Sequence, residues 1–258
     1  MRALAALGAA LVVLLLAVPL LALLWRTLEG GALLPAMGNP LVGQALRLSL
    51  ITSAVSLGLA VLCGTPLAYG LARANFPGRG AIDALVDVPV VLPPAVAGIA
   101  LLMAFGRRGV LGAPLDALGI SLAFTPIAVV LAQSFVAVPF YVRAARTGFA
   151  GVDRDLEGAA RVDGASALDV FRHITVPLAA PSLLTGAVLC WARALGEFGA
   201  TIMFAGSFRG RTQTMPLAIY AALESDLSAT LALSAILVAV SVAVLGVIRA
   251  ISGRSASA

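Results

Sequence analysis

The stretch Glu157–Pro177 reads EGAARVDGASALDVFRHITVP and forms a polar island in a very apolar chain. Only 11% of the 258 residues are charged, 61% are hydrophobic, and the mean hydropathy is +1.06. A soluble domain would have about a quarter of its residues charged. The composition therefore predicts an integral membrane protein, in which the polar island must stay outside the hydrocarbon.

The apolar runs between charged residues predict the membrane helices. Each is about long enough to cross ~30 Å of hydrocarbon as a helix. Lipid offers no partner for backbone N–H and C=O groups, so each run should be helical. We expect an all-α integral membrane protein forming a single domain. Its six transmembrane helices are predicted at about residues 3–25, 46–72, 85–106, 124–143, 182–204 and 227–249.

The polar island belongs to a predicted loop, residues 153–177, between the fourth and fifth helices. Asp153 can cap a first short helix, and Gly164 suits the position just after its end. Ser166 followed by Asp169 resembles a capping box that starts a second short helix, which Pro177 closes. This second helix carries an apolar stripe that either packs on the protein's own membrane helices or forms a knob for a groove on a cytoplasmic partner. The stripe consists of Leu168, Phe171 and Ile174.

The island also resembles a known family element, the cytoplasmic coupling loop of ABC-importer permeases. Gly164, Ile174 and Pro177 stand at the matching spacing. The family's glutamate position holds Gly158, and the acidic residue Glu157 comes one position earlier, which leaves the role of this carboxylate open. The coupling residues that the resemblance implies are Glu157, Ala160, Asp163, Gly164, Ala165, Phe171, Ile174 and Pro177.

Three further runs resemble permeases of the molybdate, sulfate and tungstate group. They are DVPVVLPPAVAGIALL (Asp87–Leu102), WARALGEFGATIMFAG (Trp191–Gly206) and RTQTMPLAIYAALE (Arg211–Glu224). The resemblance covers roughly Ser49–Val244 and implies the type I ABC importer fold. It favours molybdate, with sulfate, thiosulfate and tungstate as alternatives. It also implies a permease dimer, formed by two identical or two different chains, with two cytoplasmic ATPase subunits and an external substrate-binding protein.

The chain has no lysine, since all 17 basic residues are arginines. A P-loop needs a lysine on the nucleotide phosphates, so ATP and Mg²⁺ should bind to the partner ATPase and no cofactor to this chain. A membrane-embedded enzyme is also disfavoured, because His173 is the only histidine and the two cysteines, Cys63 and Cys190, lie far apart in apolar runs. Nucleic-acid binding is not expected, because the arginines do not cluster with interleaved aromatic residues.

The arginines also indicate the orientation. Ten of them fall on the side of the predicted loop and five on the opposite side, so this loop and both termini should be cytoplasmic in a prokaryotic inner membrane. The outer loop 207–226, with Arg209 and Gln213, either docks the binding protein or is a solvated connection. An ion-coupled secondary transporter is a rival reading that needs membrane-embedded carboxylates, for which only Asp87 and Glu197 qualify.

Three features are candidates for the translocation pathway. Pro93 and Pro94 lie in the middle of the third predicted helix, where proline bends a helix. Arg193 and Glu197, four residues apart on the fifth helix, form either a gate or a structural ion pair. Polar side chains on the fourth and fifth helices could contact an oxyanion or serve only in packing. They belong to Gln133, Ser134 and Thr201.

Overall fold

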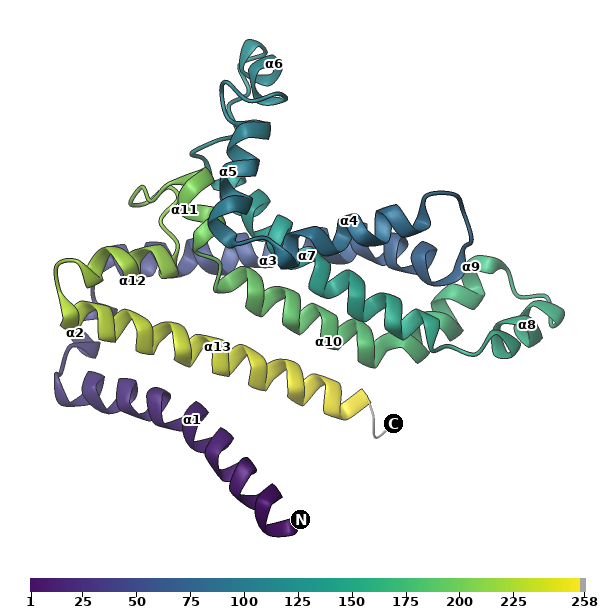
Figure 1. Cartoon of the computed structure of the whole chain (residues 1–258), viewed down its shortest axis with the longest axis horizontal. Coiled ribbons are helices and arrows are strands. Elements are labelled where there is room, and N and C mark those ends of the chain that lie inside the picture. The colour runs from purple at the N-terminus through teal and green to yellow at the C-terminus, as the bar shows by residue number, and fades with distance from the viewer. Residues whose placement is uncertain (256–258) are drawn as a thin grey trace.

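The computed structural model describes residues 1–255 of the chain, and these residues confirm the all-helical membrane architecture. Five helical segments are long and apolar enough to cross a membrane, or six when one bent pair of helices counts as a single span. Four of the long helices run roughly along the long axis of the molecule (Figure 1), namely α3 (Pro40–Arg73), α7 (Pro126–Ala150), α10 (Val176–Leu195) and α13 (Leu227–Ser255). The fifth, α1 (Arg2–Glu29), runs obliquely beside α13.

Shorter helices gather at the two ends of this bundle. One end holds α8 (Arg154–Val162) and α9 (Ala167–Val170), and the opposite end holds α2 (Leu33–Met37) and α12 (Met215–Leu223) (Figure 1). Near the middle, α5 (Pro94–Phe105) and α6 (Gly112–Ala117) project sideways from the bundle, and α11 (Gly199–Ala205) lies at the base of this projection (Figure 1).

The core of the bundle is α7, packed between α3 and α10 through small residues. A Cβ atom added at Gly64 of α3 would lie 3.0 Å from the Tyr141 ring of α7. A Cβ atom at Gly186 of α10 would lie 2.8 Å from Cβ of Ala144, on the same helix α7. Close approach of this kind is how helices associate in lipid, where no hydrophobic driving force acts between them.

In contrast, α1 is almost wholly exposed. Thr27 near its end is buried and donates a hydrogen bond to the carbonyl oxygen of Leu231 in α13, at 3.2 Å. The long apolar surface of α1 therefore faces lipid or another subunit, as the surface of a membrane helix must.

Local end signals explain where the long helices begin. Asn39 accepts a hydrogen bond from the N–H of Leu41 and precedes Pro40 in the first turn of α3. Thr125 accepts from the N–H of Ala128 and precedes Pro126 of α7. A capping side chain followed by proline is a typical helix start, and it places both starts a few residues away from the predicted ones.

The third predicted helix, residues 85–106, is two helices rather than one kinked helix. The first, α4 (Arg79–Val91), and the second, α5, meet at an angle of 118°. Leu92 and Pro93 both have extended backbones, with ψ angles of 135° and 134°. Each of these residues precedes a proline, and a residue in that position is disfavoured in the α conformation. Two consecutive prolines therefore break the span instead of bending it.

The fifth predicted helix, residues 182–204, is wrong at both ends. Residues 167–195 form one continuous helical segment, in which α9 passes through a π-helical turn, η1 (Phe171–Thr175), into α10. Pro177 lies in the first turn of α10, so it does not close the preceding segment as predicted. Because proline has no N–H, one backbone hydrogen bond is missing here, and the adjacent π-helical turn accommodates that loss. At the other end, Gly196 terminates α10, and α11 is a separate helix.

Candidate functional site

The predicted loop 153–177 begins as the local signals indicated. The Asp153 side chain caps α8 by accepting a hydrogen bond from the N–H of Asp155 at 2.9 Å. Gly164 follows the end of α8 with a φ of +91°, a left-handed conformation that favours glycine. Ser166 and Asp169 form the predicted capping box at the start of α9. The glycine elbow between two helices is therefore confirmed, although the second helix continues into the membrane span.

Glu157 proves to be a buried anchor for this loop. Its side chain is only 9% exposed and lies 3.1 Å from the guanidinium of Arg73, at the end of α3. The same carboxylate oxygen accepts a hydrogen bond from the hydroxyl of Thr175 at 2.7 Å. Arg73 also donates to the carbonyl oxygen of Val152 at 2.8 Å. The carboxylate thus connects α3, α8 and the start of the long helical segment, so Arg73 and Thr175 join the site although sequence reasoning missed them.

Phe171 points inward, which contradicts an outward knob built on it. Its ring centroid lies 5.1 Å from that of Tyr69 and 6.1 Å from that of Phe149. These aromatic partners belong to α3 and α7, so the stripe packs on the protein's own helices at Phe171, and Ile174 is likewise half-buried. A spacing of three residues marks one apolar face but does not reveal what that face contacts.

Other apolar side chains of the loop do face solvent. Val162 at the end of α8 is 88% exposed, Leu168 at the start of α9 is 62% exposed, and Leu156 is 50% exposed. Of the remaining predicted coupling residues, Asp163, Gly164 and Pro177 are exposed, whereas Ala160 and Ala165 are half-buried. Val162 and Leu168 flank the glycine elbow, so the outermost part of the loop is an apolar tip.

In the middle of the molecule, the structure brings two helix breaks together. A Cβ atom at Gly199, the first residue of α11, would lie 2.7 Å from Cβ of Pro94, the first residue of α5. One turn along α5, a Cβ atom at Gly98 would lie 2.7 Å from the carbonyl oxygen of Ala200. The break at Pro93 and Pro94 therefore lies directly against the break between α10 and α11.

Glu197 occupies the second break and is 1% exposed. One carboxylate oxygen accepts the backbone N–H of Ala200 at 2.7 Å, in the first turn of α11, and the other lies 2.5 Å from the guanidinium of Arg193. The predicted ion pair exists, but Glu197 lies between two helices rather than inside one. Its carboxylate therefore joins the end of α10 to the start of α11.

The predicted polar pathway residues are closed off from solvent in this conformation. The amide nitrogen of Gln133 and the hydroxyl oxygens of Ser134 and Thr201 are buried and have no hydrogen-bond partner among the groups that the structure describes. The amide oxygen of Gln133 lies 3.3 Å from the hydroxyl of Ser56 on α3. Gln133 therefore faces α3, whereas Thr201 lies on α11 beside the two helix breaks. The structure places Thr201, Glu197 and the prolines in one region, whereas the side-chain oxygen of Gln133 contacts α3.

The remaining carboxylate of interest, Asp87, is paired as well. Arg143 of α7 lies 2.6 Å from Asp87 of α4, and one turn away Arg146 pairs with Asp83. Both arginines lie inside α7, which continues to Ala150, beyond the predicted end of the fourth helix at residue 143. The two ion pairs hold α4 against α7.

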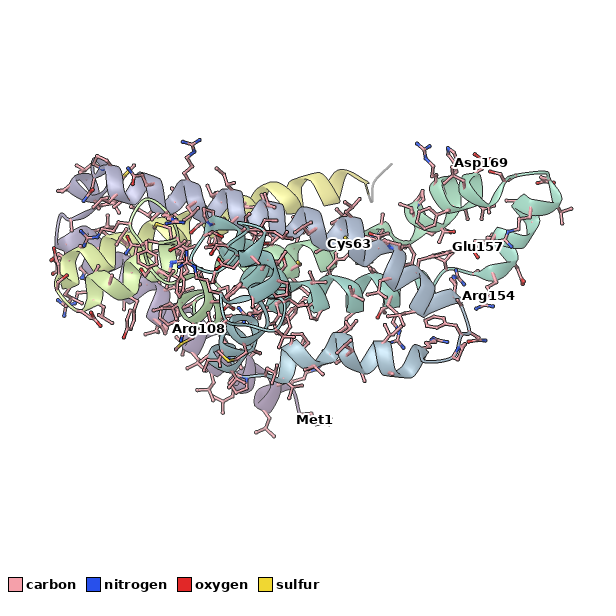
Figure 2. The ribbon with its side chains drawn as sticks, turned by 90° about the horizontal axis from the view of Figure 1, so that it is seen from above. Met1, Cys63, Arg108, Arg154, Glu157 and Asp169 are labelled. Atoms are coloured by element: carbon pink, nitrogen blue, oxygen red, sulfur yellow. The ribbon has the colours of Figure 1, made fainter. Side chains whose placement is uncertain are left out.

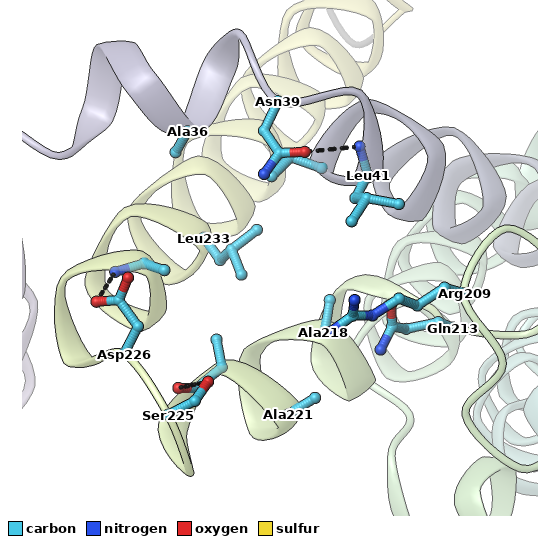
Figure 3. Close-up of a pocket in the computed structure, with 13 residues that line it drawn as sticks. Ala36, Asn39, Leu41, Arg209, Gln213, Ala218, Ala221, Ser225, Asp226 and Leu233 are labelled. Carbon is cyan, nitrogen blue, oxygen red and sulfur yellow. Dashed lines mark hydrogen bonds between the residues drawn. The ribbon is translucent and has the colours of Figure 1, made fainter.

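A cavity of about 260 Å³ opens at the end of the molecule opposite α8. Arg209 and Gln213 of the outer loop reach it, together with Asn39 and Asp226 (Figure 3). Asp226 caps α13 by accepting the N–H of Ser228 at 2.9 Å. Arg209 is exposed while Gln213 is nearly buried, so only part of the outer loop is a solvated connection.

Comparison with known proteins identifies the family to which the chain is similar. Residues 60–257 match the family described as binding-protein-dependent transport system inner membrane component. A molybdenum transport system permease protein of Mycobacterium tuberculosis is 46% identical over 210 residues, which are 81% of this chain and 80% of that protein. Another, from Escherichia coli, is 43% identical over 183 residues, which are 70% of this chain and 80% of that protein.

Among solved structures, a bacterial alginate ABC transporter in complex with its alginate pentasaccharide-bound periplasmic protein contains a similar chain. The TM-score is 0.78 at 16% sequence identity, over 98% of this chain and 94% of that chain. At this identity the similarity establishes the fold alone, which is that of a type I ABC importer permease.

Proposed function

Since the chain belongs to the family of binding-protein-dependent transport system inner membrane components, we propose that it is the permease subunit of an ATP-driven importer that carries molybdate into the cytoplasm. The observation that carries the proposal is the loop at α8 and α9, a two-helix element with a glycine elbow at one end of an apolar bundle. Molybdate is favoured because relatives with more than 40% identity are molybdenum transport permeases.

The proposed assembly contains two copies of this permease, two cytoplasmic ATPase subunits and an external oxyanion-binding protein. ATP and Mg²⁺ bind to the ATPase subunits. The tip residues Val162 and Leu168 make the main contact with the ATPase, because they are the most exposed apolar side chains of the loop. Phe171 and Glu157 act from behind the tip and hold the loop on α3 and α7.

The loop end of the bundle is cytoplasmic in this proposal, and both termini lie on the same side. Arginines support the orientation, because Arg73, Arg79, Arg154, Arg161 and Arg172 all lie at the loop end. An excess of arginine marks cytoplasmic segments of membrane proteins. The cavity with Arg209 then faces outward, where the binding protein docks.

The translocation pathway passes the paired breaks at Pro93–Pro94 and Glu197. Irregular backbone at membrane depth is tolerated where protein or an aqueous cavity surrounds it. Rocking of α10 relative to α11 changes the Arg193–Glu197 contact, so this ion pair acts as a gate as well as a structural link. The buried hydroxyl of Thr201 becomes available to an oxyanion when the gate opens.

The decisive experiment reconstitutes the permease with its ATPase and binding protein in liposomes. Molybdate uptake should require ATP inside and binding protein outside, and tungstate or sulfate should compete according to the affinity of the binding protein. Uptake without ATP, driven by a proton or sodium gradient, would instead support a secondary transporter. Native mass spectrometry of the purified complex tests whether the two permease copies are identical.

A further inference from the structure

A second cavity of about 260 Å³ lies at the coupling loop, between the end of α3 and α8. It is smaller than the roughly 300–1,000 Å³ typical of pockets for drug-sized ligands, so it suits a small ion. Arg154 and Glu157 lie close together at this end of the molecule, far from Arg108 in the loop after α5 (Figure 2). The cavity is lined by Tyr69, Arg73, Arg154, Glu157, Gly158 and Arg161.

The lining carries an excess of positive charge. Three of its side chains are arginines, and its one carboxylate, Glu157, is already bound by Arg73 and Thr175. Neither Arg154 nor Arg161 forms an ion pair with any carboxylate in the part of the chain that the structure describes. In addition, Nε of Arg73 is buried and has no hydrogen-bond partner among the described parts of the chain. The cavity therefore presents several donors that lack an acceptor.

The helical spacing of α8 produces this arrangement. Arg154, Glu157, Gly158 and Arg161 follow the i, i+3, i+4, i+7 pattern, which places them on one face of the helix. A Cβ atom at Gly158 would meet no other atom within 4 Å. The absence of a side chain at Gly158 therefore keeps the space between the two outer arginines open.

We propose that this cavity binds a tetrahedral oxyanion at the cytoplasmic face. The planar guanidinium group offers paired N–H donors that match two oxygens of such an anion. Molybdate, sulfate and phosphate share this chemistry, and so does the phosphate headgroup of an anionic lipid. The site lies at the loop, away from the helix breaks, so it is distinct from the proposed translocation pathway. Its ligand would bridge α8 and the end of α3, adding to the link made by Glu157.

The test uses the whole permease chain in lipid nanodiscs. In the first arm the lipid is neutral phosphatidylcholine, and molybdate and inorganic phosphate are titrated separately by calorimetry. In the second arm the nanodiscs contain phosphatidic acid, and native mass spectrometry measures its retention by the permease. Binding is the readout in both arms, so the result does not depend on whether the protein transports molybdate.

Three variants test whether the residues that line the cavity bind the anion. Each of Arg154→Gln and Arg161→Gln should weaken binding about tenfold, since each removes a charged donor. Gly158→Leu keeps every charge but fills the space, so it should abolish binding. Arg172→Gln serves as the matched control, because Arg172 is an exposed arginine of the same loop that does not line the cavity.

The two arms distinguish the sources of the ligand. Loss of molybdate or phosphate binding in the three variants assigns the site to a free oxyanion. Variant-sensitive retention of phosphatidic acid alone assigns it to a lipid headgroup. The proposal is overturned if neither ligand binds, or if the variants bind as tightly as the unchanged protein and the Arg172→Gln control.

Discussion

Replacing Glu157 with glutamine should release the coupling loop from the bundle. The change keeps the shape of the side chain and an oxygen that can still accept a hydrogen bond from the hydroxyl of Thr175, but it removes the charge opposite Arg73. Removing one partner of a buried ion pair costs about 3–5 kcal/mol. The Arg73 side chain keeps 11% exposure and borders a polar cavity. Water can therefore solvate part of its charge, and we expect a cost of about 3 kcal/mol, at the low end of that range.

Hydrogen exchange of the loop amides measures this cost directly. If local opening controls exchange, about 3 kcal/mol corresponds to roughly a hundredfold faster exchange. The acceleration should be confined to residues 154–175 and to the end of α3. Substituting methionine for both Arg73 and Glu157 should recover most of the protection, because that pair leaves no buried charge without a partner.

Glu224→Gln is the control, since Glu224 is exposed and its carboxylate forms no ion pair with the described residues. Its loop exchange should match that of the unchanged protein. Equal exchange rates in Glu157→Gln and the control would show that the carboxylate does not hold the loop. The reasoning from burial and distance would then be refuted.

Four further changes test other parts of the structure. Gly98→Ala should destabilise the purified permease by about 1–3 kcal/mol in thermal unfolding because its methyl group collides with a backbone carbonyl, while Gly58→Ala, where the added atom meets nothing within 4 Å, should not. Phe171→Ala should lower the unfolding temperature, as expected for an aromatic residue removed from packing. Leu168→Asp should leave the unfolding temperature unchanged and abolish stimulation of the ATPase by loaded binding protein; the opposite pattern would restore the outward knob at Phe171. Glu197→Gln should slow ATP-driven uptake in liposomes while ATPase binding persists, and unchanged uptake would exclude a gating role.

The sequence predicted those features of the loop that depend on near neighbours. The cap at Asp153, the left-handed glycine at Gly164 and the capping box at Ser166 all involve residues two or three positions apart. Glu157 could not be assigned in this way, because its partner Arg73 is 84 residues away. The inward orientation of Phe171 could not be predicted for a similar reason, since its aromatic partners come from two other helices.

In the membrane spans too, features that depend on local sequence were predictable and contacts between distant residues were not. Long apolar runs predicted that helices would form in these regions, and the two prolines indicated the disturbance in the third, but the ends of the fifth predicted helix were wrong. Hydropathy did not predict the break at Gly196, because the apolar run continues past Glu197 to Phe204. At this break the carboxylate of Glu197 accepts the backbone N–H of Ala200 in the first turn of α11. The close contact of α5 with α11 likewise depends on two glycines about 100 residues apart.

The unbroken segment from Ala167 to Leu195 gives the permease a mechanical lever. Its 29 residues span about 43 Å at 1.5 Å per residue. Rotation of such a rod by about 5° around its centre would displace each end by roughly 2 Å, in opposite directions. One end carries the exposed tip at Leu168, and the other ends beside Glu197. A push by the ATPase and a change at the gate would then be a single movement of one rigid body, with no need for a relay of side chains between them.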